Sequence, residues 1–142
     1  ATRERAKQEA EAKAKAEAET REAAAIAERE AAAIAQAKGA GFVPFRKSGK
    51  LPFETIGAKY GLEYGDDEIE VHIDSFQSGE RVLIVDDVLA TGGTLIAAIE
   101  LARKCGAIVN KVIVLFEIDF LEGRKRINQI YPDIEIITLA HA

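Results

Sequence analysis

The chain contains no methionine, no tryptophan, only three prolines and a single cysteine among its 142 residues. Because one cysteine cannot form a disulfide within the chain, the sequence favours a reducing compartment, and we expect a cytoplasmic protein. No apolar run reaches the roughly 20 residues that a membrane-spanning helix needs, and no signal-peptide pattern is present. The net charge of −5 argues against general binding to nucleic acids. These absences leave a soluble single domain, large enough to bury a core, as the expected class.

Residues 1–38 lack glycine, proline and aromatic side chains, and nearly all of them are Ala, Glu, Lys, Arg or Gln. Such residues have high helix propensity, and Gly39 supplies a stop signal. A helix of some 35 residues would be roughly 50 Å long. The stretch from Glu9 to Glu19 alternates strictly, which is a strand period, but Ala, Glu and Lys are poor strand formers. We therefore predict one long helix, with a strand in this stretch as the alternative.

The second half of this helix carries a thin apolar stripe that could dock on a sheet or on a partner helix. The first half has little to bury, so we expect its ends to fray. The stripe consists of Ala23, Ile26, Ala27, Ala31 and Ile34.

The most informative stretch is Val82–Thr94, which reads VLIVDDVLATGGT. Its apolar beginning lacks alternation and therefore suits a parallel strand that is buried on both faces. Asp86 and Asp87 follow, and we expect them to end that strand, where an open α/β sheet binds its ligands. The next residues offer unobstructed backbone N–H groups at the start of a helix, which indicates a phosphate-binding loop. These loop residues are Ala90, Thr91, Gly92, Gly93 and Thr94.

Each part of this motif is commonplace by itself, as a core strand, an exposed acid pair or a turn before a helix. Their order, from strand to acid pair to glycine loop to helix, is what favours a binding site. The loop lacks the lysine of the GxxxxGK[ST] sequence, so a Walker-type NTPase is not expected.

The elements around the motif predict an α/β fold. Gly41–Arg46 has strand character, and Pro44 places it near a sheet edge. Thr55–Leu62 and the alternating Glu68–Asp74 are expected to form a hairpin that covers the site, with His72 on its polar side. The order of strands and helices after residue 81 predicts a parallel sheet with right-handed crossovers. Its remaining elements are a helix at Leu95–Lys104, a strand at Val112–Phe116, a helix at Gly123–Ile130 and a strand at Ile134–Thr138.

The motif at Val82–Thr94 closely resembles the binding motif for 5-phosphoribosyl-1-pyrophosphate (PRPP) in type I phosphoribosyltransferases. Two further stretches resemble adenine phosphoribosyltransferases, namely GFVPFRKSGKLPFETI at Gly41–Ile56 and LEYGDDEIEVHID at Leu62–Asp74. The resemblance extends from about Gly39 to the C-terminus. It implies a phosphoribosyltransferase-like parallel sheet with a flap at about residues 47–75.

The resemblance also implies a reaction, in which adenine N9 displaces pyrophosphate from C1 of PRPP to form AMP in purine salvage. The loop at residues 90–94 would then hold the 5-phosphate, and Asp86 and Asp87 would hold the ribose hydroxyls. Glu63 and Tyr64 in the flap would lie near the reacting base. Mg²⁺ would accompany PRPP and neutralise its pyrophosphate. Members of the family are commonly homodimers.

A basic cluster follows the GFVP sequence and consists of Arg46, Lys47 and Lys50. In the light of the resemblance, these side chains would stabilise the leaving pyrophosphate. The alternative is a solvated basic loop.

The chain also departs from the family. Family members carry a strand ending in a Glu-x-Arg-Gly loop that grips pyrophosphate, and an N-terminal segment that contacts adenine. Neither is found in this sequence, so the predicted sheet is incomplete at its N-terminal part. The missing strand would lie between the partners of Gly41–Arg46 and Val82–Asp87, so its loss leaves a gap or forces direct pairing. With the absence of methionine, this favours an engineered or altered protein, divided into a helical extension at 1–38 and a phosphoribosyltransferase-like core at 39–142.

Three functional hypotheses remain open. The chain is an adenine phosphoribosyltransferase with impaired activity; or it binds phosphoribosyl ligands such as AMP without turnover; or its helix directs assembly. A homodimer or a helix-mediated oligomer is expected, with neither nucleic acid nor membrane as a partner.

Overall fold

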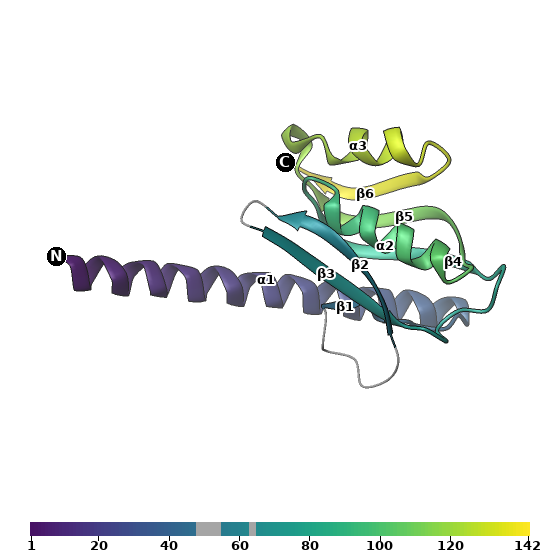
Figure 1. Cartoon of the computed structure of the whole chain (residues 1–142), viewed down its shortest axis with the longest axis horizontal. Coiled ribbons are helices and arrows are strands. Elements are labelled where there is room, and N and C mark those ends of the chain that lie inside the picture. Colours follow the sequence, from purple (N-terminus) through teal and green to yellow (C-terminus); the bar gives the residue numbers. More distant parts are fainter. Residues whose placement is uncertain (48–54, 63–64) are drawn as a thin grey trace.

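The computed structural model describes residues 1–47, 55–62 and 65–142, and it shows two three-stranded sheets with helices packed on them (Figure 1). In chain order the elements are α1 (Thr2–Lys38), β1 (Arg46–Lys47), β2 (Thr55–Leu62), β3 (Gly65–His72), β4 (Arg81–Leu89), α2 (Gly93–Lys104), β5 (Ile108–Glu117), the 3-10 helix η1 (Asp119–Leu121), α3 (Gly123–Ile130) and β6 (Glu135–His141).

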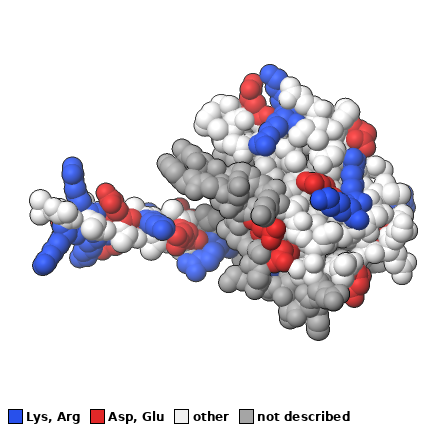
Figure 2. Space-filling view, viewed as in Figure 1, with Lys and Arg blue, Asp and Glu red and all other residues white. Residues whose placement is uncertain are grey.

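Helix α1 confirms the predicted long helix, and the alternating stretch within it is helical because propensity outweighs pattern. It ends at Gly39, which has a φ of 63° and donates its N–H to Gln36 O at 3.2 Å. Every side chain described between Ala1 and Ile26 is exposed, and this half of the helix projects from the rest of the molecule. Charged side chains of both signs cover the projecting part (Figure 2). No helix in the described ranges is long and apolar enough to cross a lipid bilayer.

The second half of α1 docks on a sheet, as the apolar stripe predicted. It contacts β4, with Ala27 buried and with Ala31 and Ile34 half-buried. Ile26, also expected in the stripe, is 39% exposed. Among the stripe residues whose side chains the structure describes, those from Ala27 onward therefore form the docking face.

The strands after residue 80 form the predicted parallel sheet, in the order β4-β5-β6. In its centre Val112 is in register with Ile84 on one side and Ile136 on the other. One prediction about this sheet is wrong, because β4 does not end at the acid pair. Its pairing with β5 continues to Leu89, which lies opposite Glu117, so Asp86 and Asp87 lie inside the strand.

The hairpin of β2 and β3 forms a separate antiparallel sheet with the short β1 on its outer side. β2 has the predicted bounds, whereas β3 begins and ends earlier than expected. The predicted strand at Gly41–Arg46 is wrong for residues 41–45, which have no regular structure. Pro44 has no N–H to donate to a ladder, and β1 forms only after it. The expected edge position is confirmed for β1.

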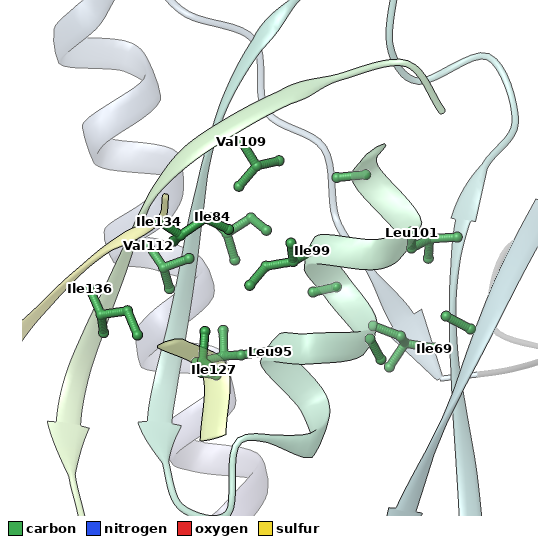
Figure 3. Packing of buried hydrophobic residues seen from close by; sticks show 14 of the residues in the cluster. Ile69, Ile84, Leu95, Ile99, Leu101, Val109, Val112, Ile127, Ile134 and Ile136 are labelled. Atoms are coloured by element: carbon green, nitrogen blue, oxygen red, sulfur yellow. The ribbon is translucent and has the colours of Figure 1, made fainter. Parts of the chain in front are cut away.

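Helix α2 contacts strands of both sheets. Ile99 points toward Ile84 and Val112 of the parallel sheet, and Leu101 lies on the side of Ile69 of the hairpin (Figure 3). Ile99 and Leu101 are completely buried. The sequence had allowed the strand at Gly41–Arg46 to pair directly with the one at Val82–Asp87. That alternative is wrong, because β1 pairs with β3 and not with β4. Among the described strands the two sheets are therefore separate.

Candidate functional site

The predicted loop joins the end of β4 to the first turn of α2. Gly92 has a φ of 90°, a left-handed conformation that favours glycine. Gly92 and Gly93 are buried, and the side chains of Thr91 and Thr94 are exposed. The N–H groups of the first helical turn have no acceptor inside the helix, and no side chain of the described residues caps them. These donors, at the positive end of α2, are suited to an anion.

A small hollow of about 50 Å³ lies at this loop. Its volume is far below the roughly 300–1,000 Å³ of pockets that enclose a drug-sized ligand. The hollow therefore fits one compact group, such as a phosphate, with the rest of a ligand outside. Its lining consists of Val88, Leu89, Ala90, Thr91, Gly92, Gly93, Thr94 and Leu95.

The start of α3 packs directly against this loop. A Cβ added to Gly123 would overlap Ala90 O and would lie 2.8 Å from Leu89 Cδ1. A Cβ on Gly92 would lie 3.1 Å from Gly123 O and 3.4 Å from Ile127 Cγ1. Only glycine at 123 allows this approach, so α3 holds the outer side of the loop.

The acid pair lies on β4, just before the loop, and both residues are half-buried. Asp87 N–H donates to Asp86 Oδ1 at 2.8 Å, and Val88 N–H donates to Asp87 Oδ1 at 2.8 Å. The pKa of Asp86 is raised from 3.8 to about 7, first by burial and then by the hydrogen bond and charge of the Asp87 side chain, while the hydrogen bond from the Asp87 N–H lowers it. At neutral pH Asp86 can therefore hold or release a proton. The carboxyl oxygens of Asp86 and Asp87 can accept hydrogen bonds from hydroxyl groups.

The other predicted site residues are not brought to the loop by the described structure. Arg46 in β1 donates to Glu28 of α1 at 2.6 Å, and no contact joins it to residues 86–94. The backbone of Lys47 lies in β1, while its side chain is outside the described part. Glu63, Tyr64 and Lys50 lie outside the described residues, and so their roles stay predictions.

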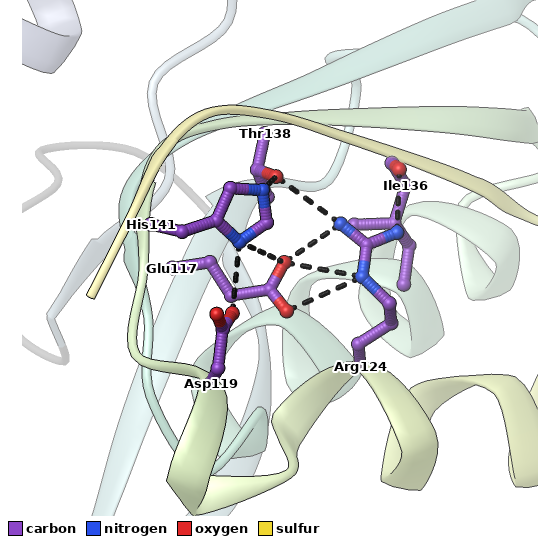
Figure 4. A network of polar contacts seen from close by, with 6 residues as sticks. All are labelled: Glu117, Asp119, Arg124, Ile136, Thr138 and His141. Atoms are coloured by element: carbon purple, nitrogen blue, oxygen red, sulfur yellow. Dashed lines mark hydrogen bonds and ion pairs between the residues drawn. The ribbon is translucent and has the colours of Figure 1, made fainter.

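The sequence reasoning missed a polar network beside the loop, at the ends of β5 and β6 (Figure 4). Arg124 Nη2 lies 2.7 Å from Glu117 Oε1, and Arg124 Nη1 donates to Ile136 O at 2.7 Å. His141 bridges Asp119 and Thr138, at 2.8 Å each. Glu117 is only 6% exposed, and its neutralisation by Arg124 explains how this charge is buried.

This network fixes the position of α3. Arg124 follows Gly123 directly, and Glu117 lies opposite Leu89, the residue before the loop. The ion pair thus anchors the start of α3 where Gly123 contacts the loop. In the sequence, Glu117 ends an apolar strand and the pair Gly123-Arg124 follows it, which was the available signal. Its relation to the loop becomes visible only when the fold brings these residues together.

Known proteins match both the sequence and the fold. Residues 53–139 match the family described as Phosphoribosyl transferase domain. An adenine phosphoribosyltransferase from Thermoanaerobacter sp. (strain X514) is 51% identical over 75 residues, which are 53% of this chain and 43% of that protein. The chain thus spans less than half the length of this curated relative.

Two solved structures place the similarity in three dimensions. The adenine phosphoribosyltransferase from Thermoanaerobacter pseudethanolicus is 48% identical with a TM-score of 0.72, covering 78% of this chain and 62% of that one. The enzyme from Trypanosoma brucei, in complex with AMP, pyrophosphate and ribose-5-phosphate, is 30% identical with a TM-score of 0.69, covering 76% and 49%. The family match extends over more than half of the chain and includes the acid pair, the loop and the parallel sheet; the chain belongs to the phosphoribosyltransferase family.

Proposed function

We propose that this chain binds the 5-phosphoribosyl group of PRPP and of AMP at residues 86–94. The observation that carries the proposal is the placement of an acid pair and an uncapped helix start on one short segment. Backbone N–H groups of the loop suit the 5-phosphate, and the carboxyl groups of Asp86 and Asp87 suit the ribose hydroxyls. The small hollow supports the binding of the phosphate alone in the loop, with the ribose directed toward the acid pair.

The reaction we propose is that of adenine phosphoribosyltransferases, the activity that the names of the similar proteins give. Adenine N9 would form a bond to the ribose C1 while the bond from C1 to pyrophosphate breaks, giving AMP and pyrophosphate. Glu63 and Tyr64 are proposed to lie near the base, and Arg46, Lys47 and Lys50 to contact the pyrophosphate. Because Arg46 is paired with Glu28, it would have to exchange partners to do so. Binding without turnover is the alternative for the same site.

Mg²⁺ is proposed to enter with PRPP. Carboxylate oxygens are ligands that Mg²⁺ accepts, usually together with phosphate oxygens of the substrate. Asp86 and Asp87 are adjacent carboxyl groups beside the proposed phosphate site, so their chemistry fits a shared role with PRPP. Asp86 would have to be ionised for this role, which its raised pKa opposes below about pH 7.

The first test is calorimetric titration with AMP and with ribose 5-phosphate. We expect saturable binding that is lost or weakened at least tenfold in the double variant Asp86→Asn/Asp87→Asn. The exposed Asp133, which pairs with Arg103, provides a matched control, and Asp133→Asn should bind as the unmodified chain does. Absence of binding by a folded unmodified chain would overturn the proposal. An assay of AMP formation from adenine, PRPP and Mg²⁺ then separates turnover from binding alone.

A second candidate function is assembly through the N-terminal helix, with 1–38 as an extension and 39–142 as the core. It is favoured by the exposure of every described side chain from Ala1 to Ile26. Deletion of residues 1–22 tests it without uncovering β4, because Ala27 and the residues after it form the docking face. Light scattering after size exclusion should give a smaller oligomer for the shortened chain. An unchanged subunit number would contradict assembly by the helix.

A further inference from the structure

We propose that Arg126 is the cationic residue of the phosphate site and strengthens its preference for a doubly charged phosphate. This inference rests on the proposed function, because it assigns to Arg126 the anion held by residues 90–94. Arg126 lies in α3, outside the sequence motif, and reaches the loop only through the fold.

The packing of α3 fixes Arg126 beside the loop. Gly123 and Ile127, on the buried side of the helix, pack against Gly92 of the loop. Arg126 lies on the same turn and donates from Nη1 to Thr91 O at 3.4 Å. Its side chain is exposed, so the guanidinium is open to solvent beside Thr91, which is one of the residues that line the hollow.

The guanidinium keeps donors for a ligand. Of its five N–H groups, the contact with Thr91 O occupies one, and the described residues offer the others no further partner. A planar guanidinium matches the oxygens of a phosphate. Arg126 can therefore remain on the loop while it donates to an anion there.

The neighbouring cations of α3 are already paired. Arg124 is held by Glu117 at 2.7 Å, and Lys125 lies 3.9 Å from Glu122. Within the described chain, Arg126 is the cation of this helix without a carboxylate partner. The loop contributes only neutral N–H groups, and Asp86 and Asp87 bring negative charge close to it. A phosphate with two charges needs a compensating cation, and Arg126 is placed to supply it.

The test compares Arg126→Gln and Arg126→Lys with the control Lys125→Gln. Glutamine keeps an N–H donor for Thr91 O but removes the charge, whereas lysine keeps the charge. At low salt and pH 8 we expect Arg126→Gln to bind ribose 5-phosphate about two- to fivefold more weakly, a size typical of an exposed charge. Arg126→Lys should retain most of the affinity, and Lys125→Gln should retain all of it. The loss should shrink as salt is raised.

Titration with inorganic phosphate, followed by the NMR shifts of the Gly92 and Gly93 amides, separates the two proposals. If phosphate shifts these amides less in Arg126→Gln than in the unmodified chain, the role of Arg126 stands. If ribose 5-phosphate binds no better than inorganic phosphate, the assignment of a ribosyl site fails, but the role of Arg126 is unaffected. Equal affinities for Arg126→Gln and the unmodified chain, an equal loss in Lys125→Gln, or unshifted amides in the unmodified chain would each overturn the role of Arg126.

Discussion

Asp86 is the residue whose ionisation the fold opposes most clearly. Its pKa rises from 3.8 in a free chain to about 7 in the folded protein, because burial and the Asp87 side chain favour the protonated form. Between these values the folded state binds more protons than the unfolded state, so this group stabilises the fold below about pH 4 and the contribution declines until about pH 7. Above that range both Asp86 and Asp87 carry a negative charge in the folded protein, and their repulsion disfavours folding.

We expect Asp86→Asn to stabilise the protein at pH 8 by about 1–3 kcal/mol, since the amide removes the charge without removing a polar partner. The decline in stability between about pH 4 and 7 should flatten in the variant. Urea unfolding at pH 4.5, 6 and 8 measures both effects, with the exposed Asp74→Asn as the control. The same pH profile in the variant and the unmodified chain would contradict this account of Asp86. Such stabilisation would accompany loss of ribose binding, as expected for a residue kept for function.

Gly123 is the second residue with a sharp prediction. In Gly123→Ala the new methyl group would meet Ala90 O and Leu89, so the start of α3 must move away from the loop. We expect a loss of about 1–3 kcal/mol in the free energy of unfolding, together with weaker binding of ribose 5-phosphate. Gly41→Ala is the control, because a methyl group there has nothing within 4 Å. Calorimetric melting of both variants should separate them, and equal melting temperatures would disprove the proposed clash.

At this scale the sequence predicted the acid pair and the loop, because their order along the chain is local. It could not predict Gly123, Arg126 or Glu117, whose relation to the loop exists only after α3 has packed. Nor could it predict the raised pKa of Asp86, which depends on burial. Arg46 illustrates the same limit, because its partner Glu28 lies in a helix whose docking the sequence left undecided.

Among the elements, α1 divides into a docked half and a free half, and the two halves should respond differently to the same substitution. Ala27→Asp would place a charge at a position only 7% exposed, against β4, and we expect a loss of about 2–4 kcal/mol. Ala12→Asp, on the exposed half, should cost less than about 1 kcal/mol, since only helix propensity changes. Chemical unfolding of the two variants measures the difference. Equal effects would show that Ala27 does not anchor the helix.

The elements themselves were largely predictable. α3 and β2 have the predicted bounds. α2 begins two residues before the predicted Leu95, β5 extends beyond the predicted strand at both ends, and β6 begins one residue later and ends three residues later than predicted. The prediction of a strand at Gly41–Arg46 was wrong because it followed the strand character of the side chains. Pro44 lacks the backbone N–H that pairing with a neighbouring strand would need. The extension of β4 beyond the acid pair arose because pairing with β5 continues past polar residues, and pairing is not visible in one segment alone.

For the whole molecule, α2 is the element that the two sheets share, so they should unfold together. We expect Leu101→Ala to cost about 2–5 kcal/mol and to leave one transition, the same by far-UV circular dichroism and by tyrosine fluorescence. Ile130→Ala, at a position 49% exposed on α3, is the control and should cost little. Two separate transitions in Leu101→Ala would mean that the hairpin sheet folds independently of the parallel sheet.

The separation of the two sheets could not be decided from the sequence, which left open whether the strands are separated by a gap or pair directly. The outcome depends on contacts between distant segments, namely β1 with β3 and α2 with both sheets. Class and strand direction, by contrast, followed from the alternation of strands and helices after residue 80.

The projecting half of α1 has a practical consequence for handling the protein. A helix of 37 residues is about 55 Å long, and its free end lies away from the sheets and from the loop at residues 90–94. A tag or surface tether attached at Ala1 would therefore be held away from the sheets by the exposed half of the helix. Immobilised through that end, the protein would keep its sheets clear of the surface, an arrangement suited to a biosensor for phosphoribosyl compounds.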